Sequence, residues 1–306
     1  MLRRALVAAS RSSVLRRVAT DVPITRNVAQ RFVAGETLEQ ALAATRELNA
    51  KGLSVTLDHL GESVTEEAVA RRSAEVYLEA LGRIAEEGLD CSVSVKPTSL
   101  GLDVSVELCD ELVGSVCAEA ARCGTHVTID MEGSDYTQAT VDLVVRLREA
   151  GHDNVGCAVQ TYLHRTPDDV RRLTGMGASL RICKGAYAEP DDIAYQDDDE
   201  VSDAYVRCAE LVLTGETFGR FATHDHRIIG RIRNLARRLE VGPDRYEFQM
   251  LYGIREPLQL ELLERGERCR VYVPFGDEWY PYFVRRLAER PANVVFFLRA
   301  LTGRRA

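Results

Sequence analysis

The chain has 306 residues, of which 45% are hydrophobic and 28% are charged, and its formal net charge is −8 at pH 7. This length and apolar content are typical of a globular protein with a substantial core, which excludes a disordered tail. The acidic balance argues against a general nucleic-acid-binding protein, because such a protein needs excess Lys and Arg to replace phosphate counterions.

The predicted elements alternate along the chain after a helical segment that includes Glu36–Leu48. Short β-branched runs predict eight strands, at 53–57, 91–95, 126–129, 155–159, 180–183, 220–223, 246–250 and 270–273. Amphipathic patterns predict helices at 66–87, 106–122, 137–149, 168–173, 203–213, 228–239, 257–264 and 278–289. Strict alternation favours a parallel sheet, and eight units favour an α/β fold of the closed (β/α)8 TIM-barrel type. We therefore predict an N-terminal helical segment, 1–50, followed by one barrel domain, 51–306, whose C-terminal helix carries an arginine pair.

The N-terminal segment and the cysteines bear on where the protein works. Five arginines and no acid lie in the first seventeen residues, a pattern found in transit peptides and membrane-surface helices. An amphipathic helix packed on the domain is the alternative. Eight cysteines without a C-x-x-C pair indicate reduced core thiols. We expect a cytoplasmic protein, with a peripheral contact at the inner face of the membrane as one reading of the arginine-rich start.

The carboxyl ends of the predicted strands are polar, and the active site of a closed barrel gathers at these ends. In chain order the ends carry Asp58-His59, Lys96, Asp130, Gln160, Arg181 with Lys184, Thr223 to His226, Leu251-Tyr252 and Tyr272. Only three of the 39 basic residues are lysines, and Lys51 alone of them lies away from a strand end. Lys96 and Lys184 are candidates for a Schiff-base nucleophile or for a contact to an anionic substrate or cofactor. A buried ion pair with Asp130 is the alternative.

The longest interruption of the alternating pattern is the stretch 189–203, which carries eight acids and no base. We expect a solvated acidic loop there. Its place after the fifth strand would also suit a mobile cover over the barrel mouth.

Two further patterns place chemistry near the mouth. His224-Asp225-His226 could direct two imidazoles toward one metal, but no third ligand is evident, so we predict no metal site. On the last helix, spacings of three and four put one set of side chains on a common face: Tyr282, Arg285, Arg286 and Glu289. Adjacent guanidinium groups form a candidate carboxylate clamp. An ordinary surface Arg–Glu pair is the alternative.

The sequence has neither the glycine fingerprint of a Rossmann unit nor a P-loop. The nearest approach, Gly175 to Leu180, precedes a strand instead of following one. A dinucleotide would therefore lie on the barrel mouth and be held by side chains. Those suitably placed for this are Gln160, Arg181, Lys184, Thr223 and His224.

Six motifs stand in order at the ends of successive strands and on the last helix. They are Ser94-Val95-Lys96, Thr128 to Glu132, Ala158 to Leu163, Arg181 to Tyr187, Thr223-His224 with Gln249 to Gly253, and Tyr282 to Glu289. Together they resemble the proline dehydrogenase family, a flavin-dependent barrel found alone or inside bifunctional proline-utilisation proteins. Two positions depart from the family's usual pattern: Pro97, where leucine is more common, and Ala188, where some relatives place an aromatic residue against the cofactor.

The resemblance implies an FAD-dependent enzyme that oxidises L-proline to 1-pyrroline-5-carboxylate, the first step of proline degradation to glutamate. It implies that Asp130 and Arg181 are catalytic, with Asp130 anchoring Lys96 and the arginines and Arg181 next to the isoalloxazine. Proline would be bound through its carboxylate by Arg285, Arg286 and Lys96, and through its ring by Tyr272, Tyr282 and Leu251. The rest of FAD would be held by Met131, Gln160, Lys184, Gly185, Ala186, Thr223 and His224, with support from Glu289 and Tyr187.

The resemblance also implies that electrons pass to a quinone and that a pyrroline-5-carboxylate dehydrogenase receives the product. Nucleic acid is not an expected partner. Two other functions stay open on the residues alone. One is a Schiff-base lyase or aldolase that uses Lys184 or Lys96, and the other is a flavin-based proline sensor without turnover.

Overall fold

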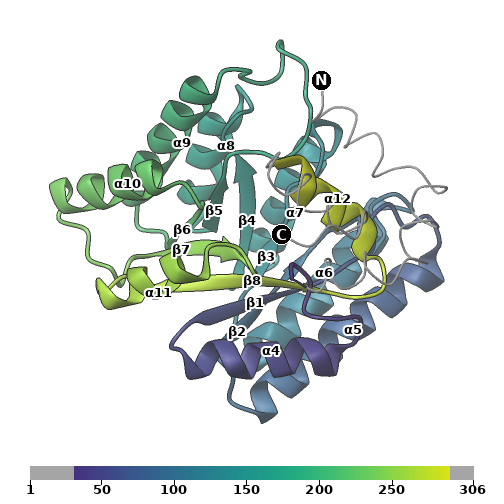
Figure 1. Cartoon of the computed structure of the whole chain (residues 1–306). Coiled ribbons are helices and arrows are strands. Elements are labelled where there is room, and N and C mark those ends of the chain that lie inside the picture. Colours follow the sequence, from purple (N-terminus) through teal and green to yellow (C-terminus); the bar gives the residue numbers. More distant parts are fainter. Residues whose placement is uncertain (1–30, 290–306) are drawn as a thin grey trace, which may run out of the picture.

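The strands form a closed parallel barrel. The computed structural model describes residues 31–289, with side chains as far as Arg286. Each strand pairs with the next along the chain, and β8 returns to β1 (Figure 1). The strands are β1 Ser54–His59, β2 Cys91–Val95, β3 Val127–Ile129, β4 Val155–Gln160, β5 Ser179–Cys183, β6 Gly219–Ala222, β7 Tyr246–Leu251 and β8 Cys269–Phe275. The (β/α)8 prediction is confirmed, and every strand begins within one residue of its predicted start.

Helices connect the strands and cover the outside of the barrel. The described α-helices are α4 Leu38–Ala50, α5 Glu67–Glu86, α6 Val106–Arg122, α7 Thr137–Glu149, α8 Thr166–Gly175, α9 Asp198–Leu213, α10 His226–Arg238, α11 Glu256–Glu264 and α12 Trp279–Glu289. Short 3-10 helices, Pro97–Leu100 and Ser134–Tyr136, follow β2 and β3. The apolar faces of α4 to α9 and of α11 pack on the strands, as the amphipathic spacing predicts.

The acidic stretch after β5 is partly helical. The Asp197 side chain accepts hydrogen bonds from the backbone N–H groups of Asp199 and Glu200, which caps the start of α9. Acids in the first turn are stabilised by the positive end of the helix dipole. The predicted loop over 189–203 is therefore wrong for its last six residues, and α9 begins five residues before the predicted start.

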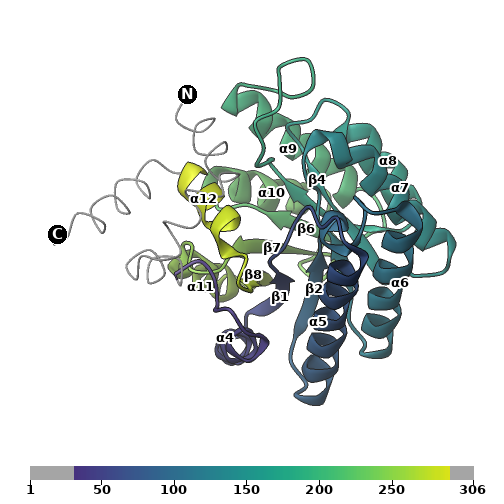
Figure 2. The same ribbon diagram turned by 90° about the vertical axis from the view of Figure 1, so that its right-hand side faces the viewer.

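The helix that covers β8 comes from the other end of the chain. α4, which precedes β1, packs against both β1 and β8 (Figure 1). It takes the place that the eighth helix holds in a regular barrel. α12 lies apart from α4 (Figure 2) and forms an apolar cluster with Phe32, Val33 and Leu60. Because Leu60 directly follows β1, this cluster places α12 at the carboxyl end of the barrel, as the arginine pair requires.

The inside of the barrel is filled by polar side chains. Buried polar residues on the strands are Thr56, Asp58, Ser92, Ser94, Thr128, Gln160, Arg181, Arg220, Glu247, Gln249 and Arg270. Branched apolar residues commonly fill such barrels, and buried polar groups need hydrogen bonds to be tolerated. The Gln249 amide, for example, donates to Glu247 Oε1 at 2.6 Å, and Arg270 Nε donates to the same oxygen at 2.8 Å. The core is thus a hydrogen-bonded network.

The structure bears on two expectations from the sequence, the arginine-rich start and the reduced core thiols. The arginine-rich start lies outside the described residues. Between residues 31 and 289, none of the helices has the length and apolar character needed to span a membrane. All eight cysteines are free, and six of them are buried, which agrees with the predicted core thiols.

Candidate active site

Four strands bring charged and phenolic groups together at the carboxyl end of the barrel. Lys96 Nζ lies 2.5 Å from Asp58 Oδ1 and 3.9 Å from Asp130 Oδ2. The Tyr272 hydroxyl donates to Asp130 Oδ2 at 2.7 Å. Asp130 was the predicted partner of Lys96, but Asp58 is the nearer one. Lys96, which directly follows β2, therefore lies between one carboxylate on β1 and another directly after β3, the two strands that flank β2.

The setting of Lys96 keeps it extended and charged. Its φ of −101° and ψ of 127° are extended, and Pro97 begins the following 3-10 helix, as expected for a residue that precedes proline. Burial disfavours the ammonium, but Asp58 and Asp130 outweigh that effect and raise the pKa of Lys96. A Schiff-base nucleophile must be neutral, so this environment disfavours the lyase chemistry for Lys96.

Arg181 crosses the barrel interior and is fixed from three sides. Its Nη1 lies 2.5 Å from Asp130 Oδ1 and donates to Ser94 Oγ at 2.9 Å, while its Nε donates to Gln249 Oε1 at 2.7 Å. The guanidinium carbon lies 5.2 Å from the centre of the Tyr272 ring. The buried Nη2 has no hydrogen-bond partner among the described residues. This donor is available to a group outside the described residues, such as a bound ligand.

Gln160, at the end of β4, ties two loops of the mouth together. Its Nε2 donates to the backbone oxygen of Glu132 at 2.7 Å, and its Oε1 accepts the backbone N–H of Ala186 at 3.3 Å. The first loop carries the buried Met131, and the second carries Gly185 and Tyr187. The Gln160 amide therefore sets the spacing between predicted cofactor-binding residues in the loops that follow β3 and β5.

Gly185 occupies a position that no other residue fits. Its φ is +123°, and an added Cβ would lie 2.2 Å from Cδ1 of Tyr162. We expect Gly185→Ala to lower the free energy of unfolding by about 2 kcal/mol or more, measured by urea unfolding, because backbone strain and overlap act together. Gly230→Ala in α10 is the matched control, since its added Cβ meets nothing within 4 Å. The control should be neutral or slightly stabilising, and equal stability of both variants would contradict this account.

The ends of β6 and β7 hold the predicted histidine motif. His224 Nε2 accepts the backbone N–H of Leu251 at 2.9 Å, so this nitrogen faces the neighbouring strand end and cannot also bind a metal. Asp225 Oδ2 lies 3.3 Å from Lys184 Nζ. Thr223 is buried beside them and accepts the N–H of Asp225 through Oγ1. The Lys184 side chain is 36% exposed, and among the described residues its ion-pair partner is Asp225.

α12 places the two arginines among buried groups. Arg285 Nη2 lies 2.5 Å from Glu62 Oε1, and the Arg285 side chain is 12% exposed. The guanidinium carbon of Arg286 lies 4.9 Å from the centre of the buried Tyr282 ring. Both arginines are too little exposed to form the ordinary surface Arg–Glu pair that was the alternative to a carboxylate clamp. Glu289 is the last residue of α12, and its side chain lies outside the described residues.

Glu132 titrates in an unusual range. Its carboxylate accepts hydrogen bonds from the Thr98 hydroxyl at 2.7 Å and the Thr98 N–H at 3.1 Å. Burial raises the pKa of Glu132 from 4.5 to about 7 in spite of these bonds. The folded state therefore holds this proton more tightly than the unfolded state does. The free energy of unfolding is expected to fall by about 3 kcal/mol as the pH rises from 4.5 to 7.

The Glu132→Gln variant tests this sign, because glutamine keeps the shape and does not titrate. Unfolding in urea at pH 5 and pH 8 should show a smaller loss of stability with pH in the variant than in the parent chain. Identical pH dependence in the two proteins would show that Glu132 titrates normally.

Four residues that shape the site had no role assigned from sequence: Asp58, Glu62, Glu132 and Gln249. Asp58 stands at a strand end, a signal that could have found it. Gln249 lies two residues before Leu251 and so faces the same side of β7. Glu62 lies in the loop after β1, where no periodic pattern marks a side chain that reaches α12.

Comparisons with known proteins agree on one family. The sequence pattern that defines the proline dehydrogenase family matches residues 41–299. Proline dehydrogenase 2 of Bacillus subtilis is 38% identical over 90% of this chain and 91% of its own, and proline dehydrogenase of Deinococcus radiodurans is 36% identical over 90% of each.

A solved structure shows the same fold. Proline utilization A from Bdellovibrio bacteriovorus, inactivated by N-propargylglycine, matches with a TM-score of 0.80 at 25% identity over 86% of this chain. This chain covers 32% of that larger protein. The barrel, the order of the strand-end motifs and the matched length lead to one assignment: the chain belongs to the proline dehydrogenase family.

Proposed function

We propose that this chain binds FAD across the barrel mouth and oxidises L-proline to 1-pyrroline-5-carboxylate by hydride transfer to the flavin. Family membership makes it an FAD-dependent oxidoreductase of proline catabolism. The observation that carries the finer proposal is the pair of α12 arginines, the buried Arg286 and the 12% exposed Arg285, at the same end of the barrel as Arg181, Asp130 and Tyr272. Cations and a braced aromatic ring at one mouth suit a small cyclic amino acid.

The residues at the mouth fit a flavin dinucleotide. Arg181 Nη2 is a buried donor without a partner in the described part of the chain. Lys184 supplies a half-exposed cation that suits phosphate oxygens. When bound, FAD supplies the two-electron acceptor. The residues proposed to hold it are Met131, Gln160, Arg181, Lys184, Gly185, Ala186, Thr223 and His224, with Glu289 as a further candidate.

The cations of the mouth fix proline by its carboxylate. Arg285 and Arg286 approach from α12, and Lys96 is the cation at the end of β2. In the structure Arg285 forms an ion pair with Glu62. The carboxylate of proline would take the place of the Glu62 carboxylate as the partner of Arg285. Binding through the carboxylate leaves the ring nitrogen free to lose its proton to solvent. The hydride would then leave the ring CH2 next to that nitrogen, not the carbon that bears the carboxylate, as the C=N bond forms, and a bound FAD would accept it.

The network around Arg181 is set before substrate arrives. Asp130, Ser94 and Gln249 hold the guanidinium, so it is already oriented to stabilise the negative charge that a bound flavin would gain on reduction. The Tyr272 ring is held by the same Asp130 and packs beside Arg181. With Leu251 and Tyr282 it forms the proposed apolar surface for the pyrrolidine ring, which orients the reacting carbon.

Several finer parts belong to the same proposal. Residues 51–306 form the catalytic barrel domain, and 1–50 the helical segment before it. Electrons pass to a quinone, and a pyrroline-5-carboxylate dehydrogenase receives the product. The chain works in the cytoplasm, with the arginine-rich start as the candidate for peripheral contact with the membrane.

The visible absorbance of the purified protein tests the function. A yellow protein whose flavin band bleaches with proline under anaerobic conditions, and which turns over proline with an artificial acceptor, is the expected result. Bleaching without turnover would favour the proline sensor. A colourless protein that forms a borohydride-trapped adduct between substrate and a lysine would replace the proposal by the lyase.

A further inference from the structure

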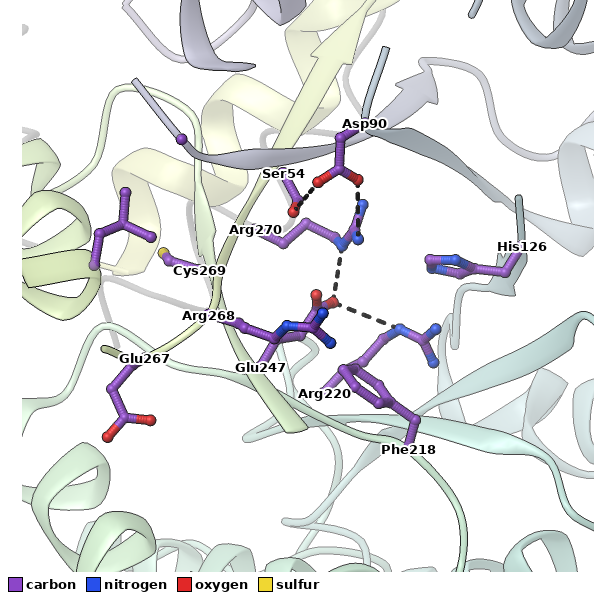
Figure 3. Close-up of a pocket in the computed structure, with 12 residues that line it drawn as sticks. Ser54, Asp90, His126, Phe218, Arg220, Glu247, Glu267, Arg268, Cys269 and Arg270 are labelled. Carbon is purple, nitrogen blue, oxygen red and sulfur yellow. Dashed lines mark hydrogen bonds and ion pairs between the residues drawn. The ribbon is translucent and has the colours of Figure 1, made fainter. Parts of the chain in front are cut away.

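A cavity lies at the amino-terminal end of the barrel, opposite the proposed active site. Its volume is about 430 Å³, and it is lined by residues at or just before the starts of several strands (Figure 3). They include His126, Phe218, Arg220, Glu247, Arg268 and Arg270. Figure 3 shows the side chains of Arg220 and His126 directed toward the same part of this cavity. None of these residues takes part in the site proposed for proline or FAD.

Arg220 and His126 present buried nitrogens that the described chain does not satisfy. Arg220 is 6% exposed, and its Nε and Nη1 have no hydrogen-bond partner among residues 31–286. The same holds for the buried Nε2 of His126. Buried donors normally have a hydrogen-bond partner, because a buried donor without one loses its hydrogen bonds to water and gains none in return, which costs free energy. Three buried nitrogens, two on β6 and one directly before β3, face one cavity without a hydrogen bond from the described residues, which indicates a missing acceptor.

Glu247 is the nearest carboxylate, but it is committed elsewhere. Its Oε1 accepts from Arg270 Nε at 2.8 Å and from the Gln249 amide at 2.6 Å, whereas Arg220 Nε is 3.6 Å away. Burial lowers the pKa of Arg220 to about 10, Glu247 opposes that shift only in part, and Arg270 and Arg181 add to it. Arg220 is thus a cation in excess of its local counter-charge.

The other acids of the cavity wall are also engaged. Asp90 Oδ2 accepts the Ser54 hydroxyl at 2.6 Å. Glu267 binds Arg233 Nε at 2.6 Å and the Tyr246 hydroxyl at 2.9 Å. The hydrogen-bond partners of the Asp90 and Glu267 carboxylates are therefore Ser54, Arg233 and Tyr246, and neither carboxylate forms a hydrogen bond with Arg220. The acids therefore leave the positive side of the cavity uncovered.

A second arginine joins Arg220 across an aromatic ring. The guanidinium carbons of Arg220 and Arg268 lie 5.2 Å and 6.0 Å from the centre of the Phe218 ring. Arg268 is exposed at the rim of the cavity, and the hydrogen bond that its side chain donates within the described residues is a long one, 3.5 Å, to the Asp244 backbone oxygen. One cation is thus buried in the cavity and another stands at its entrance.

We propose that this amino-terminal cavity binds a small oxyanion of the phosphate class between Arg220, Arg268 and His126. Guanidinium groups match phosphate oxygens through paired hydrogen bonds. Burial, together with repulsion by the neighbouring arginines, lowers the pKa of His126 well below its usual value, which favours the neutral imidazole. With its hydrogen on Nε2, a neutral imidazole donates one further bond. A tetrahedral anion offers enough acceptor oxygens to meet all three groups at once.

Isothermal titration of the FAD-loaded full chain with inorganic phosphate, at constant ionic strength, tests the site. The parent protein should bind phosphate saturably, and Arg220→Gln and Arg268→Gln should each raise the Kd about tenfold or more, as expected for loss of a charged hydrogen bond. Arg265→Gln is the matched control, because Arg265 is an exposed arginine at the end of α11 that pairs with Glu261. Arg285→Met is the control for anion binding at the opposite mouth. Both controls should keep the Kd of the parent.

Three outcomes would overturn the proposal. They are absence of saturable binding by the parent, an unchanged Kd in Arg268→Gln, and loss of binding in Arg285→Met with retention in Arg268→Gln. Arg268 is exposed, so its variant stays informative if the buried Arg220 variant fails to fold. Circular dichroism and flavin content establish folding for each variant. The result is independent of proline turnover, so failure here leaves the proposed function untouched.

Discussion

Replacement of Arg285 by methionine is expected to raise the KM for proline about 100-fold while FAD stays bound. Methionine keeps an unbranched apolar side chain in the α12 packing but removes the charge. Loss of one partner of a desolvated charge pair costs about 2–5 kcal/mol, and about 2.7 kcal/mol corresponds to a hundredfold change. Steady-state kinetics with an artificial acceptor measure KM, and the flavin absorbance per protein measures cofactor content.

The control for Arg285 is a second arginine-to-methionine change away from the mouth. Arg265→Met alters an exposed residue of a surface ion pair, so its KM and flavin content should match the parent. An unchanged KM in Arg285→Met would remove Arg285 from the carboxylate clamp. Loss of flavin with a normal KM in the remaining holoenzyme would make it a packing residue instead.

Replacement of Lys96 by methionine is expected to lower both stability and turnover. Asp58 is fully buried and has Lys96 as its closest cation, at 2.5 Å. Removing one partner of a buried pair leaves an uncompensated charge, which costs about 3–5 kcal/mol. Urea unfolding should show this loss. Lys51→Met is the control, because Lys51 is exposed and ends α4, and it should change neither property.

The double variant Lys96→Met with Asp58→Leu separates the structural role of Lys96 from its proposed contact with substrate. Removing both charges should restore a large part of the stability, because no buried carboxylate is left unpaired. The KM for proline should stay raised if Lys96 contacts the carboxylate. Recovery of the parent KM together with stability would show that Lys96 only braces the barrel.

The pH dependence of the single Lys96 variant has a defined sign. Burial raises the pKa of Asp58, and Lys96 opposes that shift. Without the lysine the pKa of Asp58 rises further, so the folded state takes up a proton that the unfolded state releases. The destabilisation should therefore shrink as the pH falls toward the ordinary carboxyl range and grow as the pH rises.

The strands and their order were predictable because each is a short buried run between clear breaks. The polar residue at each strand end was predictable for the same reason, since the end of the apolar run marks it. Closure of the barrel then places all of these residues on one rim. Position on the rim does not define contact partners, which is why the sequence predicts Asp130 as the partner of Lys96 and indicates no role for Asp58, the nearer carboxylate.

Two features lay beyond what the pattern could show. Asp197 and the acids after it resemble solvated loop, but they cap and begin α9, because the same side chains suit both settings. The polar barrel interior was hidden in a different way. Arg220, Glu247 and Arg270 interrupt apolar runs singly, and only the closed ring reveals that they face one another.

The covering of β8 by α4 bears on how the chain folds during synthesis. α4 leaves the ribosome before any strand, yet one of the two strands on which it packs is the last strand to be made. The face of α4 that includes Ala41 and Leu42 cannot be fully buried until β8, more than two hundred residues later in the sequence, has been synthesised. Contacts of such long range are slow to form, and apolar surface exposed meanwhile favours aggregation. Docking of α4 onto the completed β1–β8 seam is therefore expected to be a late folding event, and a chain interrupted before Cys269 would lack that seam.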